Sequence, residues 1–164
     1  MAPSYKKYEM QQQEIELDDL DKNILRELQE DGKLSLRKLS RLTGSSITAI
    51  KNHLDKLNSI GVIKRYIALV DCCKIGYHEM LIISLRINTS VPIGSVLNNL
   101  EQLNAINCIY QVSGEFPVLC LAKCISKQNQ INLIEKVKRI KGVEEVITEI
   151  VMRRIKEDMR VKIP

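Results

Sequence analysis

Three short stretches in the first third of the chain repeat apolar side chains every three or four residues, and tight turns separate them. This spacing places the apolar side chains on one face of an α-helix. We expect a first helix from about Asp18 that ends at Gly32, a second over residues 35–43, and a third that Ser45 or Ser46 caps. The side chains predicted to face inward in the last two helices are Leu36, Leu39, Leu42, Ile47, Ile50, Leu54 and Leu57. Two helices joined across the turn at Gly44 are typical of a helix-turn-helix.

The same region is strongly basic. Residues 32–70 carry eight Lys or Arg and one acid, a formal charge of +7, whereas the whole chain carries +5. A compact basic module indicates binding to the phosphate backbone of nucleic acids. Aromatic residues are sparse, with no Trp and one Phe, so stacking on single-stranded bases is not expected. Residues 62–70 are rich in β-formers and suit the wing of a winged helix, followed by a hinge.

The third helix is predicted to read DNA, because small and polar residues cover the face opposite its apolar stripe. Such residues can reach base edges, and basic residues beside them can reach phosphates. The predicted DNA-binding residues are Arg37, Lys38, Ser45, Ser46, Thr48, Ala49, Lys51, Asn52, His53 and Lys56. Asn52 can pair bidentately with adenine, and the helix has no Arg for guanine. We therefore expect a preference for A·T-containing half-sites, about one helical turn apart in a dimer.

The second half of the chain alternates strand and helix patterns. Strands are predicted over residues 80–88, 106–113, 118–124 and 143–152, and helices over 92–103 and from the cap Ser126 to Gly142. This βαββαβ order predicts a ferredoxin-like domain, and an α+β fold for the whole chain. Residues 118–122 are apolar on both sheet faces, so helices on one side leave an apolar face that a second copy would cover.

Several function classes find no support in the sequence. The five cysteines lack the paired spacing of a zinc site, so no metal or cofactor is expected. We interpret the adjacent residues Cys72 and Cys73 as ordinary thiols; a redox switch is the less favoured alternative. No phosphate loop, nucleophile elbow or paired-histidine helix indicates an enzyme. No apolar run is long enough to cross a bilayer and no signal peptide is recognised, so a cytoplasmic location is expected.

From about Leu17 to Glu157 the chain resembles the Lrp/AsnC (feast/famine) family of transcriptional regulators. The motifs that carry the resemblance are Leu17-Asp18…Asp21…Ile24-Leu25, Thr43-Gly44-Ser45-Ser46 with Gly61-Val62-Ile63, Val70-Asp71…Gly76-Tyr77, Gly114-Glu115-Phe116 and the final strand Thr148–Met152. The resemblance implies a winged helix-turn-helix over 17–64, a hinge over 65–78, and a RAM-type effector and dimerisation domain over 79–164. Residues 1–16 precede them and are expected to form a flexible extension, because they are polar, Gln-rich and without a usable period. The resemblance also implies dimers, often assembled into tetramers or octamers, that bind amino acids or related metabolites.

The resemblance places effector binding at the turn between the middle strands and on the last strand. The implied effector residues are Ser113, Gly114, Glu115, Phe116, Pro117, Val146 and Thr148. Three positions depart from the family pattern: His53 replaces a frequent Arg, Pro117 a frequent Asp, and Val146 a frequent Thr. The Asp carboxylate can take the amino group of an amino-acid ligand, and proline cannot.

The function predicted from all these features is a sequence-specific regulator that binds double-stranded DNA as a dimer or larger assembly, modulated by a small metabolite such as an amino acid. Two other functions stay open from the sequence. One is a DNA-compacting oligomer with little sequence preference. The other is a metabolite sensor that uses its winged helix for protein contacts.

Overall fold

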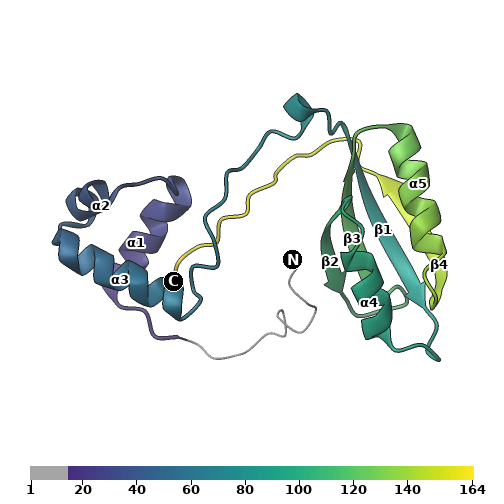
Figure 1. The fold of residues 1–164 in the computed structure, drawn as a ribbon, viewed down its shortest axis with the longest axis horizontal. Coiled ribbons are helices and arrows are strands. Elements are labelled where there is room, and N and C mark those ends of the chain that lie inside the picture. The colour runs from purple at the N-terminus through teal and green to yellow at the C-terminus, as the bar shows by residue number, and fades with distance from the viewer. Residues whose placement is uncertain (1–14) are drawn as a thin grey trace. The chain divides into compact units, whose positions relative to one another are not determined.

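The structure, a computed structural model, describes residues 15–164, which divide into two compact units (Figure 1). The helical unit comprises residues 15–70 together with Lys156–Pro164, and the sheet unit comprises Asp71–Ile155. The chain therefore passes from one unit to the other after Val70 and returns after Ile155. The predicted domain bounds had assigned residues 156–164 to the second domain. The predicted extension over residues 1–16 lies largely outside the described residues.

The helical unit packs three helices around one small core. These are α1 (Asp19–Glu30), α2 (Leu36–Thr43) and α3 (Ile47–Ser59), which agree with the three helices predicted from the apolar spacing. The side chains buried between them are Ile24, Leu25, Leu39, Ile50 and Leu57. Since each helix contributes to the same cluster, the apolar faces fix how α2 and α3 are held against α1.

Side chains cap the start of each helix. Asp18 caps α1 by accepting a hydrogen bond from the backbone N–H of Asp21, whose own side chain accepts from the N–H of Asp18. Ser35 caps α2 and Ser46 caps α3 in the same way. Each cap satisfies a backbone donor that the helix itself leaves unpaired. The capping of α3 by Ser46, rather than by Ser45, settles the alternative that the sequence left open.

Three features of the helical unit differ from the predictions. Residues 62–70 run without regular secondary structure, so the predicted β-wing is wrong. A strand needs a neighbour to pair its backbone groups, and the described residues of this unit provide no second strand. Leu42 and Ile47, predicted to face inward, are 52 % and 45 % exposed. They end α2 and begin α3, where the helices leave the shared core.

The C-terminal segment packs against α1. The side-chain amide of Gln29 donates to the carbonyl of Val161 at 2.9 Å and accepts from the N–H of Val161 at 2.7 Å. Ile163 packs against the core of the helical unit, and the guanidinium of Arg160 binds the Glu30 carboxylate. Hydrogen bonds from the Gln29 side chain to the backbone of Val161, the apolar contact of Ile163 and an ion pair together hold residues 156–164 to this unit.

The sheet unit is a four-stranded antiparallel sheet with strand order β2-β3-β1-β4. Its elements are a 3-10 turn η2 (Cys73–Ile75), β1 (Glu79–Ile87), α4 (Ile93–Glu101), β2 (Ile106–Gln111), β3 (Val118–Cys124), α5 (Lys127–Lys138) and β4 (Val143–Ile150). Both outer strands arrive through helical crossovers, so consecutive strands of the chain are not all neighbours in the sheet. This topology confirms the predicted ferredoxin-like arrangement and the α+β class.

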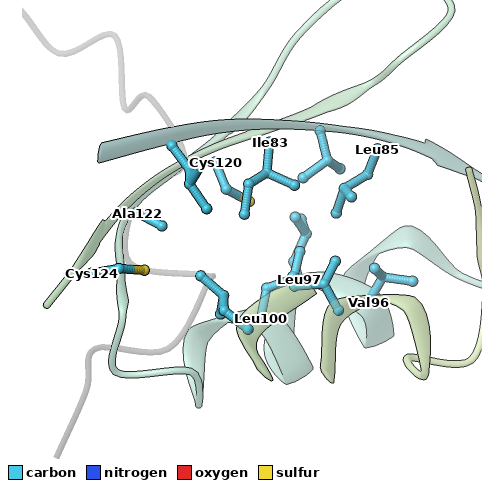
Figure 2. Packing of buried hydrophobic residues seen from close by; sticks show 12 residues of the cluster. Ile83, Leu85, Val96, Leu97, Leu100, Cys120, Ala122 and Cys124 are labelled. Atoms are coloured by element: carbon cyan, nitrogen blue, oxygen red, sulfur yellow. The ribbon is translucent and has the colours of Figure 1, made fainter. Parts of the chain in front are cut away.

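The core of the sheet unit lies between the sheet and its two helices. Figure 2 shows Ile83, Leu85 and Cys120 projecting from the strands toward Leu97 and Leu100 of α4. Alternate residues of β3 are buried, which is the period-two pattern of a strand with one face on a core. The helices cover only that face.

The other face of the sheet, here called the open face, carries no helix from residues 15–164. Cross-strand pairing groups its residues in rows: Leu121 lies between Cys108 and Ile82, and Leu119 lies between Tyr110 and Ser84. Ile147 of β4 continues the second row and is 40 % exposed. An apolar surface of this kind on a single chain is typical of a protein–protein contact.

Candidate DNA interface and effector region

The turn between α2 and α3 is held in place by the backbone and by Ser40. Gly44 adopts a positive φ of 69°, which lets the chain leave α2 and re-enter α3 within a few residues. The Ser45 N–H donates to the carbonyl of Ser40, and the Ser40 hydroxyl donates back to the carbonyl of Ser45. These contacts fix the start of α3 relative to α2.

The residues predicted to contact DNA fall into three groups by their placement. Arg37 and Lys38 on α2, and Thr48, Lys51 and Asn52 on α3, are exposed. Ser45 and Ala49 are half-buried, and the hydroxyl of Ser46 accepts the N–H of Ala49 at 3.1 Å. The remaining two, His53 and Lys56, contact α1. The exposed group therefore offers one amide, one hydroxyl and three cations to a ligand.

His53 and Lys56 meet at the side chain of Asp21. The carboxylate of Asp21 is fully buried; one oxygen lies 2.8 Å from Nδ1 of His53, and the other accepts from Nζ of Lys56. Asp18 lies beside them, with its carboxylate oxygens 3.7 Å from Nδ1 of His53 and 3.7 Å from Nζ of Lys56. The lysine side chain stays 43 % exposed and the histidine 24 %. The group couples α1 to the middle of α3.

The electrostatics of this cluster favour the ion pair. Burial by itself raises the pKa of Asp21, but hydrogen bonds from Lys56 and His53 outweigh it and hold that pKa below its ordinary value. The hydrogen bond to Asp21 in turn raises the pKa of Lys56. Both shifts keep the two groups charged near neutral pH, so the attraction between α1 and α3 persists there.

Asp18, Asp21 and His53 are the one group of metal-type ligands found among residues 15–164, with ligand atoms within 4.8 Å of one another. The arrangement does not fit a metal, because the ammonium group of Lys56 already lies between the two carboxylates. A metal ion bound there would be repelled at short distance by the positive charge of Lys56.

The turn between β2 and β3, over residues 113–117, is fixed by Arg86 of β1. The Arg86 guanidinium binds the Glu115 carboxylate and, at 3.0 Å, the carboxylate of Glu145 on β4. It also lies 5.0 Å from the centre of the Phe116 ring. The N–H of Val112 donates to the carbonyl of Pro117 at 2.9 Å and closes the turn. Glu115 is therefore engaged within the chain.

The predicted effector residues lie on two faces of the sheet. Val146 pairs with Leu85 and Thr148 with Ile83, so both point to the side that the helices cover. Arg86 pairs with Glu145 on the open face, where it meets the turn. Val146 packs against the core. Within one chain, Val146 and Thr148 are thus not brought together with Ser113, Gly114, Glu115, Phe116 and Pro117.

Two residues central to these arrangements were absent from the predicted sites. Asp21 was named only within the first motif of the family resemblance, and Arg86 was not singled out. A signal existed for Asp21, since an acid at an apolar helix position requires a cationic partner when it is buried. For Arg86 no local signal existed, because its partners are 29 and 59 positions away in the chain.

Comparison with known families finds two matching models along the chain. Residues 17–64 match the family model described as winged helix-turn-helix DNA-binding. Residues 80–161 match the model described as the Lrp/AsnC ligand binding domain, which alone spans half of the chain.

Curated proteins similar to this chain include transcriptional regulators from Pyrococcus. An uncharacterised HTH-type transcriptional regulator of Pyrococcus furiosus is 30 % identical over 152 residues, covering 90 % of this chain and 99 % of the relative. The HTH-type transcriptional regulator FL11 of Pyrococcus horikoshii is 30 % identical over 143 residues, covering 87 % and 94 %. The similarity therefore extends over both domains and not over one alone.

Solved structures share the fold. A Neisseria meningitidis transcriptional regulator in complex with L-Met superposes with a TM-score of 0.84 at 20 % identity, covering 90 % of this chain and 97 % of that one. Escherichia coli AsnC gives a TM-score of 0.82 at 24 % identity, covering 92 % and 100 %. A helix-turn-helix unit joined to a ligand-binding sheet unit, with full-length relatives of the same kind, places this chain in the Lrp/AsnC family of transcriptional regulators.

Proposed function

We propose that this regulator binds double-stranded DNA as a dimer or larger assembly, with α3 in the major groove, and that a small metabolite modulates its binding. The observation that carries the proposal is the exposed face of α3 beside α2. Thr48 and Asn52 present a hydroxyl and an amide there, while Arg37, Lys38 and Lys51 present cations. A helix-turn-helix domain binds DNA by this combination of base-edge and phosphate contacts.

The placement of Lys56 changes its proposed role. Its Nζ is bound to Asp21, so we assign it first to holding α3 against α1 and only secondarily to phosphate contact. The phosphate contacts then fall to Arg37, Lys38 and Lys51. With on the order of six contacts per dimer, binding should weaken about a thousandfold between roughly 50 and 200 mM salt.

The open face supports self-association. It carries Ile82, Leu119, Leu121 and Tyr110 with no covering helix, and a second copy would bury the same residues against themselves. Leu121→Glu should therefore produce monomers in sedimentation equilibrium. Ile131→Glu places the same charge on an exposed residue of α5 and should leave the assembly unchanged. If the two variants had the same oligomeric state, the open face would not be the surface through which the chains associate.

Metabolite binding is proposed at the turn over residues 113–117 of neighbouring chains. A Mycobacterium tuberculosis feast or famine regulatory protein, 25 % identical to this chain with a TM-score of 0.84, has been solved in complex with L-methionine. In this chain Pro117 supplies no carboxylate for an amino group, and the nearby Glu115 is bound to Arg86. Isothermal titration with the twenty amino acids tests the proposal; a ligand without an α-amino group is the expected alternative class.

The first experiment selects sheared genomic DNA with the purified protein at about 150 mM salt, where non-specific binding is weak. Enriched sites with protections one helical turn apart would support a specific regulator. Recovery of all DNA fragments without enrichment would favour the DNA-compacting oligomer. Recovery of no DNA would favour the metabolite sensor that uses its winged helix for protein contacts. A cytoplasmic location follows from the proposed DNA target.

A further inference from the structure

Two adjacent thiols in the sheet unit each lie against a cationic side chain. The guanidinium of Arg154 donates to Sγ of Cys73 at 3.0 Å, and Nζ of Lys123 donates to Sγ of Cys72 at 3.4 Å. Cys73 is exposed and Cys72 is half-buried. Thiol–disulfide exchange requires a sulfur that a reagent can reach, and the exposed sulfur of Cys73 meets that requirement.

A small basic cavity lies beside this pair. Its volume is about 200 Å³, and its lining includes Lys123 and Arg154, the two residues that contact the sulfurs, together with Arg153 and His78. The acid in the lining, Glu79, accepts a hydrogen bond from the Gln130 amide at 3.0 Å. The cavity thus offers cationic groups within the reach of a small anion that reacts at the sulfurs.

The other cysteines lie in different surroundings. Cys120 and Cys124 are buried in the core, where burial raises the pKa of Cys120 to about 12 and that of Cys124 above its ordinary value. Cys108 is half-buried on the open face. The backbone at Cys73 is held by Asp71, whose carboxylate accepts its N–H at 3.1 Å. Among the five thiols, Cys73 alone combines exposure with a cation in contact.

We propose that Cys73 is a modification site that forms mixed disulfides with small, carboxylate-bearing disulfides. The Cys73 thiolate attacks one sulfur of the incoming disulfide, a bond forms between the two sulfurs, and the original sulfur–sulfur bond breaks. The departing sulfur leaves as a thiolate and takes up the proton that Cys73 released. The Cys73 sulfur is oxidised and the departing sulfur is reduced, so the exchange needs no further oxidant. Arg153 and Lys123 bind the carboxylates of the attached group.

The geometry favours this chemistry over a soft metal ion. Two adjacent thiolates can bind such a cation, but Lys123 and Arg154 would repel it at contact distance. The same charges attract an anionic disulfide.

The position of Cys73 gives the modification a route to a regulatory effect. The chain enters the sheet unit at Asp71 and leaves it after Ile155. The bond between Cys73 and Arg154 therefore joins the two segments that connect the units, within three residues of each boundary. A group attached to Sγ of Cys73 would replace the hydrogen bond from Arg154, and the two connecting segments would lose that contact with each other.

The test treats the fully reduced chain with 3,3′-dithiodipropionate, a small disulfide with two carboxylates and no amino group, and follows adducts by intact mass, with the site assigned by peptide fragmentation. We expect the first adduct at Cys73. Its formation should slow roughly fivefold in Arg154→Gln, because the thiolate loses its cation. Arg139→Gln, which removes an exposed arginine that follows α5 and pairs with Glu135, is the matched control and should react at the rate of the unaltered chain.

A second comparison tests the cavity. 3,3′-Dithiodipropionate should react several times faster than the uncharged 2-hydroxyethyl disulfide, and Arg153→Gln should reduce that ratio. Adducts first at Cys108 or Cys72, or equal rates in Arg154→Gln and Arg139→Gln, would overturn the assignment. None of these readouts involves DNA, so their outcome is independent of the proposed function.

Discussion

The buried carboxylate of Asp21 on α1 binds Nζ of Lys56 on α3, and the second oxygen of the same carboxylate lies 2.8 Å from His53. A single acid thus contacts two residues of the helix proposed to read DNA. Because the acid has no exposure of its own, its position is set by the core of the helical unit. The orientation of α3 therefore depends on a charge pair as well as on apolar packing.

Replacing the acid should weaken the helical unit. Asp21→Asn keeps the size of the side chain but removes the charge that binds Lys56 and His53, so we expect a loss of about 1–3 kcal/mol in the free energy of unfolding. Urea denaturation followed by circular dichroism measures it. Asp19→Asn alters an exposed acid in the same helical turn and should change stability much less.

The effect of Asp21 should also depend on pH. Its pKa in the folded chain is held below the ordinary value of 3.8, so its contribution is present above that value and is lost as the pH falls through the lower, folded pKa. The stability difference between the unaltered chain and Asp21→Asn should be constant near neutral pH and shrink below pH 3.8. A difference that grew in acid would contradict the ion pair.

Local features of the sequence predicted the fold well. The caps Ser46 and Ser126 and all four strands of the sheet unit were found where short-range patterns placed them, since capping and periodicity act within a few residues. The wing over residues 62–70 was predicted wrongly because β-propensity does not supply a pairing strand.

Contacts of the candidate sites were less predictable. The helix pattern predicted exposed side chains for Lys56 and His53. Both side chains instead contact Asp21 of α1, which lies more than 30 positions earlier in the chain. Cys73 and Arg154 lie 81 positions apart. Pairings of this kind follow from the tertiary fold, and a single sequence carries no local signal for them.

Asn52 and Lys51 of α3 should affect DNA binding differently. Asn52→Ala should relax discrimination at one base pair by about 1–3 kcal/mol, because a bidentate amide contact to adenine is lost. Lys51→Ala should weaken all sequences about equally and reduce the salt dependence, since a phosphate contact carries no sequence information. Competition binding to a library of single-base variants measures both, and the reverse pattern would show that the faces of α3 are assigned wrongly.

Gly142, which precedes β4, should tolerate no side chain. Its φ is 99°, and an added Cβ would lie 2.9 Å from a methyl carbon of Val91. Gly76 has a similar φ of 94° but open space around it. Both alanine variants carry the backbone strain, about 1 kcal/mol. Gly142→Ala should lose more stability than Gly76→Ala, because only it also forces Val91 to move; equal melting temperatures would show that Val91 yields freely.

The C-terminal segment should contribute to the stability of the helical unit, although it follows the sheet unit in sequence. Ile163 packs against the core around α1, and Val161 forms two hydrogen bonds with Gln29. Ile163→Ala removes part of a half-buried apolar side chain and should cost about 1 kcal/mol. Lys162→Ala, at the exposed neighbouring position, should cost close to nothing. Hydrogen exchange at the backbone amides of α1 measures the effect locally. We expect faster exchange in Ile163→Ala than in Lys162→Ala. Identical exchange rates in the two variants would show that residues 156–164 do not stabilise this unit in solution.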